Sequence, residues 1–214
     1  MNYLKFKNYF QEYPLIASKD VLKIYGNNQA VHNQLNRWQK RGLILKLRKG
    51  LYLLNKNERR VSPGQMLIAN NLYQPSYVSL EHALSFCGLI PERSYTVTSV
   101  TTKKTAHFKN MEGDFSYQHI KPQAFRGFRE MKDPSGCSVF IAEPEKAVVD
   151  FLYLNLRKFR VNPKEALSDS FRFQNIEDLR QKRLLDLARL FRNRKLFKVV
   201  KDFCGLIRSS NKHD

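Results

Sequence analysis

The first forty residues predict three helices, because apolar side chains recur there at helical spacing. The first helix carries aromatic residues on one side and ends before Pro14. Ser18 can cap a short second helix, which ends at Gly26. Asn27 or Asn28 can cap a third helix, which runs to about residue 41. The inward positions of this third helix are Val31, Leu35 and Trp38.

Two short β-prone runs follow the third helix, at residues 43–47 and 51–54. They are joined by the basic loop Arg48-Lys49-Gly50. Three helices followed by a hairpin with a basic, glycine-containing loop are the elements of a winged helix-turn-helix, in the same order. We therefore predict a winged helix-turn-helix DNA-binding domain over residues 1–57.

The third helix has an outer face that carries amides and cations but no carboxylate. Amides pair with adenine edges in the major groove, and guanidinium or ammonium groups pair with guanine edges or phosphates. A face that is merely solvated is the alternative, although such faces normally mix Glu with Lys. On the hairpin, cations would contact backbone phosphate. The DNA-binding residues that we predict are Ser18, Asn28, Gln29, His32, Asn33, Asn36, Arg37, Lys40, Lys46, Arg48 and Lys49.

Beyond the hairpin the pattern predicts a small α+β middle domain over residues 61–142. One helix can begin at Ser62, and another follows a cap at Ser79 and ends near Gly88. The run at 95–102 alternates Thr and Ser with Val, which predicts a strand with one solvated face. The turn at 112–114 predicts an antiparallel meander. Further strands are predicted at 105–109, 114–120 and 137–141.

The C-terminal region, residues 143–214, is predicted to be helical, with apolar stripes wide enough to pack on the middle domain. Three interpretations of its many cations stay open: a solvated face, a second nucleic-acid surface, or a dock for an acidic partner protein. A membrane-surface role is disfavoured, because the stripes lack clustered Trp and Phe. Helices are predicted at 146–159, 162–173, 176–192 and 197–207. The second basic surface would consist of Arg180, Arg183, Arg189, Arg192, Lys195 and Lys198.

The formal net charge of +19 is concentrated at the two ends of the 214-residue chain. Residues 1–60 hold 13 Lys and Arg against 3 Asp and Glu, and residues 157–214 hold 16 against 7. The stretch between them, 61–156, holds 9 of each and is neutral. Segregated positive charge favours surfaces that bind a polyanion.

Features that the sequence lacks predict the cellular location of the protein and the state of its cysteines. No apolar run reaches the roughly 18–20 residues of a membrane span, and the N-terminus has no apolar signal core. The three cysteines are too widely spaced to form a disulfide framework or a zinc site. We therefore expect a cytoplasmic protein that does not bind membranes.

One cluster of residues is a candidate metal-dependent nuclease site: Asp133 before a strand, then Glu143, Glu145 and Lys146 after it. Such a site needs an acid two residues before the lysine, and none stands there. A helix start explains the cluster more simply, because both glutamates oppose the positive end of the helix dipole. We therefore expect no catalysis, no metal and no cofactor. The histidines that lack zinc-ligand spacing are His82, His107 and His119.

Six blocks of sequence stand in a fixed order along the chain. They are RKGLY at 48–52, YVSLEHAL at 77–84, GLIPER at 88–93, YTVTSVTT at 95–102, FSYQHIKP at 115–122 and IAEPEKAVVD at 141–150. Together they resemble the AbiEi-type antitoxins and their regulator relatives, over about residues 1–157.

The resemblance implies a bacterial type IV toxin–antitoxin regulator. Its winged helix would repress its own operon at inverted repeats in double-stranded DNA, and its C-terminal portion would counter a cognate nucleotidyltransferase-like toxin. The alternative is a partner-binding antitoxin or phage-defence component whose winged helix is mainly a scaffold. The sequence leaves open the oligomeric state, the operator and the identity of any toxin.

Overall fold

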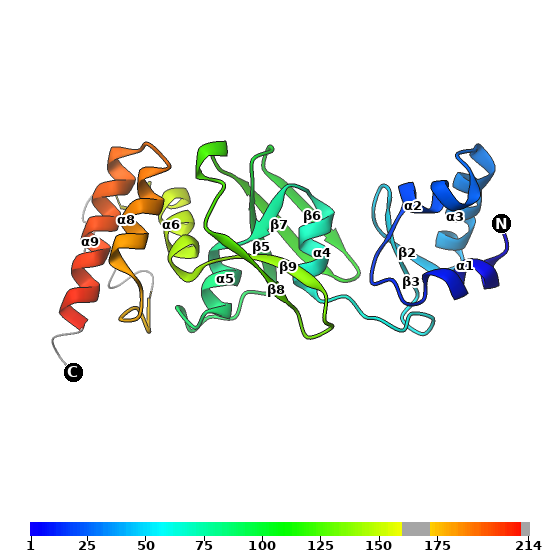
Figure 1. Cartoon of the computed structure of the whole chain (residues 1–214), viewed down its shortest axis with the longest axis horizontal. Coiled ribbons are helices and arrows are strands. Elements are labelled where there is room, and N and C mark those ends of the chain that lie inside the picture. The colour runs from blue at the N-terminus through cyan, green and yellow to red at the C-terminus, as the bar shows by residue number, and fades with distance from the viewer. Residues whose placement is uncertain (160–171, 211–214) are drawn as a thin grey trace.

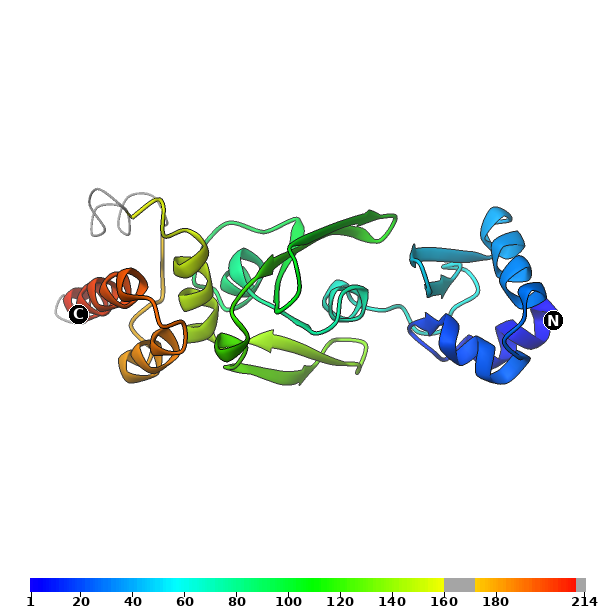
Figure 2. The ribbon, with the colours of Figure 1, turned by 90° about the horizontal axis from the view of Figure 1, so that it is seen from above.

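A computed structural model of the chain describes residues 1–159 and 172–210. The chain folds as an α+β protein with an elongated shape (Figure 1). An N-terminal head, residues 1–60, lies at one end, a six-stranded sheet lies in the centre, and helices α8 and α9 lie at the other end. The view from above shows the same three parts in a row (Figure 2).

The head contains the three helices and the hairpin that the sequence predicts. It also contains a strand that the sequence analysis missed, β1, which has only two residues and pairs antiparallel with β3. The result is a three-stranded sheet in the order β1-β3-β2. The elements are α1 (Tyr3–Phe10), β1 (Ile16–Ala17), α2 (Ser18–Tyr25), α3 (Gln29–Lys40), β2 (Ile44–Arg48) and β3 (Leu51–Leu54).

The helix starts of the head differ from the prediction at one of two positions. Asn28 caps α3, because its Oδ1 accepts a hydrogen bond from the Val31 amide at 3.0 Å. Ser18 does not cap α2. It is the first residue of the helix, and the capping position belongs to Ala17, which has no side-chain acceptor. The backbone amide of Ser18 donates to the Gly50 carbonyl at 2.9 Å, so Ser18 joins α2 to the hairpin loop.

The middle of the chain forms a six-stranded sheet in the order β6-β7-β5-β4-β9-β8. Four of these strands match predicted strands to within one residue, whereas β4 and β8 were not predicted. The strands are β4 (Ser76–Val78), β5 (Thr96–Thr101), β6 (Ala106–Asn110), β7 (Gly113–His119), β8 (Phe128–Lys132) and β9 (Ser138–Ala142). The helices among them are α4 (Gln65–Leu72), α5 (Leu80–Phe86) and the 3-10 helix η1 (Pro122–Ala124).

The sheet is mixed, which corrects the expectation of an antiparallel meander. β6 and β7 pair antiparallel, as the turn predicted. However, β7 inserts between β6 and β5 and runs parallel to β5, and β4 runs parallel to β9. The turn at 112–114 determines only the local hairpin, and the neighbour on the other side of β7 is chosen by packing.

Both faces of the sheet are covered at its centre, so the solvated face that was predicted for β5 is limited to Thr96 and Thr98, which are half-buried and line a surface pocket. Val97 and Val100 are three residues apart and therefore point to opposite faces. Ser99 and Thr101 are fully buried. On their face the Tyr117 hydroxyl donates to the Ala69 carbonyl of α4 at 2.6 Å. On the other face the Tyr77 hydroxyl donates to Asp150 at 2.9 Å.

The C-terminal helices extend the same core. Most of α6 (Pro144–Leu154) is buried between the sheet and the pair formed by α8 (Gln181–Arg189) and α9 (Arg194–Ser210). α8 is shorter than the predicted helix at 176–192, and the predicted helix at 162–173 falls almost entirely outside the described residues. Within 1–159 and 172–210, no helix is long and apolar enough to cross a membrane.

Candidate nucleic-acid interface

The outer face of α3 is the first part of the candidate interface. Val31, Leu35 and Trp38 are buried in the head, and Trp38 packs edge-on against Tyr3 of α1, with ring centroids 5.3 Å apart. Because these three residues follow the i, i+4, i+7 spacing, the opposite face must point outward. His32 is half-buried, and the exposed residues of this face are Gln29, Asn33, Asn36, Arg37 and Lys40.

Local contacts order the start of this face. The Asn28 cap fixes the first turn of α3. The side chain of Gln29, the first residue of α3, donates to Oδ1 of Asn33, which lies one turn further on, at 3.0 Å. This contact aligns two side-chain amides along the helix. The first turn contains no acidic residue, and the last turn contains Arg37 and Lys40. The structure therefore brings together amide donors and acceptors with two cations, on one exposed helix face.

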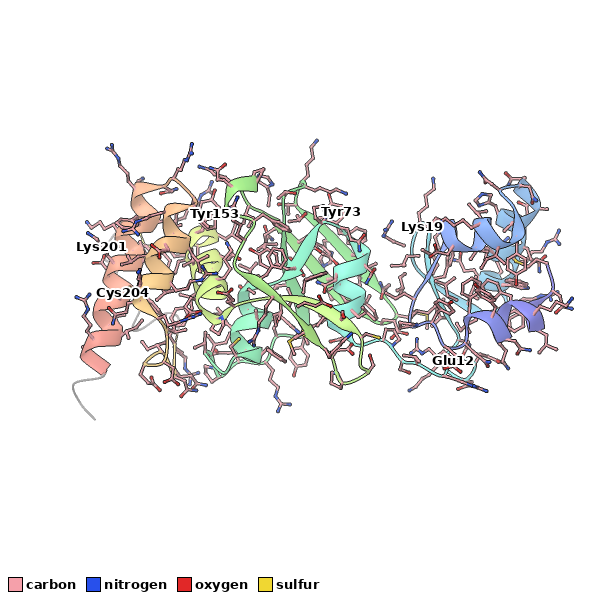
Figure 3. The ribbon with its side chains drawn as sticks, in the orientation of Figure 1. Glu12, Lys19, Tyr73, Tyr153, Lys201 and Cys204 are labelled. Carbon is pink, nitrogen blue, oxygen red and sulfur yellow. The ribbon has the colours of Figure 1, made fainter. Side chains whose placement is uncertain are left out.

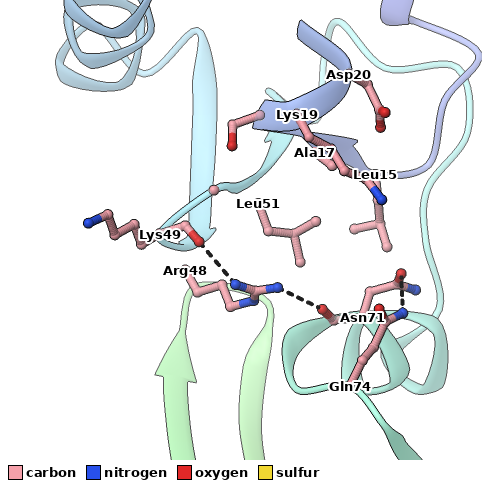
Figure 4. A pocket seen from close by; sticks show the side chains of 11 residues that line it. Leu15, Ala17, Lys19, Asp20, Arg48, Lys49, Leu51, Asn71 and Gln74 are labelled. Carbon is pink, nitrogen blue, oxygen red and sulfur yellow. Dashed lines mark hydrogen bonds between the residues drawn. The ribbon is translucent and has the colours of Figure 1, made fainter. Parts of the chain in front are cut away.

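The hairpin loop supplies the second part of the interface. Lys46 and Lys49, which the sequence analysis predicts to contact phosphate, are both exposed. Arg48 is also exposed, but it bridges the head and the middle of the chain: its guanidinium donates to the Lys49 carbonyl at 3.1 Å and to the Asn71 carbonyl of α4 at 3.5 Å (Figure 4). The loop turns at Gly50, whose φ of +82° suits glycine.

The head is held against the middle by packing as well as by polar contacts. Leu47, Leu51 and Leu53 of the hairpin belong to the main core and not to the core of the head. The Asn110 amide donates to the Leu47 carbonyl at 3.4 Å. The hairpin is therefore anchored on the body of the protein, and α3 lies on the far side of the head (Figure 1).

A groove of about 580 Å³ lies between α2, the hairpin loop and α4 (Figure 4). It is lined by Ser18, Lys19 and Lys49, among other residues. Lys19 was not among the predicted contacts. Its position next to Ser18 at the start of α2 was the available signal. In Figure 3 Lys19 lies at the upper side of the head and Glu12 at its lower side. Tyr73 of the middle is also at the upper side in this view.

The predicted second basic surface is divided by the structure into two groups. Arg180 and Arg183 form ion pairs that fasten α8 to the start of α6. Arg180 Nε donates to Glu145 at 2.8 Å, and Arg183 donates to both oxygens of Glu143 at 2.9 and 3.0 Å. Arg189 is exposed and pairs with Asp186. Of the six residues predicted for this surface, three are exposed and form no ion pair with the described residues: Arg192, Lys195 and Lys198.

The residues of the nuclease hypothesis are not brought together as an open site. Lys146 is fully buried against Asp150. Asp133 Oδ1 accepts three hydrogen bonds from its own turn, two from Ser135 and one from the Cys137 amide. Burial opposes ionisation of Asp133, but these hydrogen bonds hold the pKa of its carboxyl below the usual value. Among the residues described, no three His, Cys, Asp or Glu side chains form a metal-binding group.

The chain matches no protein family model, and no curated protein matches it significantly. The geometry offers an exposed helix face for hydrogen bonds to base edges, with cations beside it for phosphates.

Proposed function

We propose that this chain is a non-catalytic, cytoplasmic DNA-binding transcriptional regulator of the AbiEi-antitoxin type, with a winged helix-turn-helix head over residues 1–57. The observation that supports the proposal most is the exposed face of α3, which carries amides and cations and no carboxylate. A helix face adapted only to water gains stability from Glu–Lys pairs one turn apart, and α3 has none.

In this proposal α3 is the recognition helix. Its 12 residues span about 18 Å, and an α-helix fits the major groove of B-DNA. Asn33 and Asn36 would pair with adenine edges, and Arg37 would pair with a guanine edge or a phosphate. The β2–β3 hairpin is the wing, whose Lys46 and Lys49 would contact phosphates and position the head without reading sequence.

The regulatory part of the proposal draws on the sequence resemblance. The chain would repress its own operon at inverted repeats and would neutralise a nucleotidyltransferase-like toxin. The exposed cations of α8 and α9 support a separate partner surface, because they lie at the opposite end of the molecule from α3 (Figure 1). That surface would suit an acidic partner.

The test is a gel-shift titration of the full chain on the DNA upstream of its own gene, at several salt concentrations. We expect binding whose logarithm falls linearly with the logarithm of the salt concentration, because each phosphate contact releases counterions. Arg37→Glu should abolish the shift by placing a carboxylate among the phosphates. Lys132→Glu, an exposed change on β8, is the matched control. Equal loss in both variants would contradict a specific role for α3.

A partner-binding antitoxin whose winged helix is only a scaffold is the second candidate, and the exposed Lys195 and Lys198 favour it. In the full chain, Lys195→Glu with Lys198→Glu should then abolish co-purification with the product of the adjacent gene while leaving the gel shift unchanged. Loss of the gel shift in this variant would instead assign these lysines to DNA.

A further inference from the structure

The hairpin loop and the turn between β5 and β6 face each other across a hollow of about 470 Å³, which we call the junction hollow. It lies where the head meets the middle of the chain, and its wall includes one cation, Lys103, from the middle, whose net charge is zero. The lining residues that matter here are Arg48, Lys49, Tyr73, Gln74, Lys103 and Phe108.

Three cations and no carboxylate line this hollow. None of the three forms an ion pair with a carboxylate of the described residues. Arg48, Lys49 and Lys103 are all exposed, and their like charges on the wall of one hollow repel one another weakly through solvent. Such an arrangement is stabilised when an anion enters between the cations.

The fold holds two of these cations, Lys103 and Arg48, in place. The Lys103 ammonium lies over the Tyr73 ring, 5.4 Å from its centroid. The backbone amide of Lys103 donates to Thr101 Oγ1 at 3.1 Å, and its backbone carbonyl lies 2.9 Å from the Nδ1 atom of His119. These two contacts hold the backbone of the turn at Lys103. Arg48 uses two N–H groups on carbonyls, and its other N–H groups stay available to an anion.

We infer that the junction hollow binds a backbone phosphate of the DNA duplex, with Lys103 as a contact from outside the head. This inference rests on the proposed function, because the duplex must already lie along α3 and the wing. Lys49 at the tip of the wing lines the same hollow as Lys103. A strand that passes the wing would therefore meet Lys103 next, and the footprint would extend onto the middle of the chain.

The test compares full-length Lys103→Ala, Lys103→Arg and Lys104→Ala in salt-dependent gel-shift titrations. Lys104 is exposed, adjacent in the same turn and outside the hollow. Loss of one phosphate contact should lower the log–log salt slope by about one and weaken binding roughly 5- to 10-fold at 0.1 M salt. Lys103→Arg keeps the charge and should retain wild-type binding, and Lys104→Ala should change binding much less.

Phosphate ethylation interference on the wild-type complex should mark a phosphate beside the wing, and Lys103→Ala should lose that mark alone. If wild type binds DNA but Lys103→Ala keeps its slope and its interference pattern, the inference is wrong and the proposed function stands. If the wild-type protein binds no DNA duplex, both this inference and the proposed function are wrong. The phosphate bound in the hollow could also belong to a free anion, which calorimetric titration with inorganic phosphate or a nucleoside triphosphate tests. If Lys103→Ala loses this binding while its DNA affinity is unchanged, the hollow binds a free anion and the inference is wrong.

Discussion

The ammonium nitrogen of Lys146 lies 2.5 Å from Asp150 Oδ1, one turn further along α6, and both side chains are completely buried. The other carboxylate oxygen accepts hydrogen bonds from the hydroxyls of Tyr77 and Ser79, each at 2.9 Å. The ammonium also lies over the Phe191 ring at 4.5 Å. One charged pair thus connects α6 to β4 on one side and to the end of α8 on the other.

Removing the cation of this pair should strongly destabilise the protein. Lys146→Met leaves the carboxylate of Asp150 buried without its counter-charge, which costs about 3–5 kcal/mol in comparable pairs. Burial already raises the pKa of the Asp150 carboxyl, so protonation should relieve part of the loss at acid pH. Urea unfolding of wild type and variant at pH 5 and pH 8 measures both effects.

The double variant Lys146→Met with Asp150→Leu serves as the control for this prediction. It removes both charges and replaces them with apolar groups, so it should cost less than the single change. A double variant that is less stable than Lys146→Met would show that the hydroxyl contacts of Asp150, and not its charge, decide the stability of the region.

Acid sensitivity should arise in part at the contact between α6 and α8. Burial alone would raise the pKa of the Glu145 carboxyl, but hydrogen bonds from the Arg180 side chain and amide lower it below the ordinary value. A carboxyl whose pKa is lower in the folded state contributes stability that is complete above about pH 4.5, its ordinary value, and is lost as the pH falls further.

Glu145→Gln should therefore flatten the fall of unfolding free energy below about pH 4.5, as measured by urea titrations across that range. Arg172→Ala breaks an ion pair with Glu92 in which both side chains are more than half exposed, and it should leave the acid limb unchanged. If the unfolding free energy of Glu145→Gln falls below pH 4.5 as steeply as that of wild type, another group is responsible for the acid sensitivity.

Much of the head could be predicted from sequence because its signals are local. The spacing of Val31, Leu35 and Trp38 determines which face of α3 is exposed, and the cap at Asn28 determines where the helix begins. Both signals lie within the helix or next to it. The two-residue strand β1 could not be predicted from the sequence, because the strand with which it pairs, β3, lies more than thirty residues further along the chain.

The strand order of the central sheet and the contacts between distant residues depend on long-range packing, which no local sequence pattern encodes. The parallel pairing of β5 with β7 places Val97 beside Phe115, and a turn signal gives no information about that neighbour. The same holds for the candidate interface. The contact of Arg48 with Asn71 follows from how the head packs on α4, and the pairs that occupy Arg180 and Arg183 join residues 35 and 40 positions apart.

The cap of α3 should matter for stability and for DNA binding together. Asn28→Ala removes the side-chain acceptor for the Val31 amide and should cost about 1 kcal/mol. Faster hydrogen exchange in the first turn of α3 would report the frayed start. Weaker DNA binding should accompany it, because Gln29 lies in that turn and its side chain donates to Asn33 in the next. Asn28→Ser should restore both properties. Asn27→Ala, an adjacent exposed change without a cap, should alter neither.

The recognition face and the wing should respond differently to substitution. Asn36→Ala or Arg37→Ala removes a base contact in the proposed complex and should relax the preference for the operator by about 1–3 kcal/mol per contact, with little change on unrelated DNA. Lys49→Ala removes a phosphate contact and should weaken all sequences alike, with a salt slope lower by about one. Competition gel shifts with operator and scrambled duplexes separate the two. Unaltered discrimination in the α3 variants would remove α3 from sequence readout, and a Lys49→Ala loss confined to one sequence would make the wing a reader of bases.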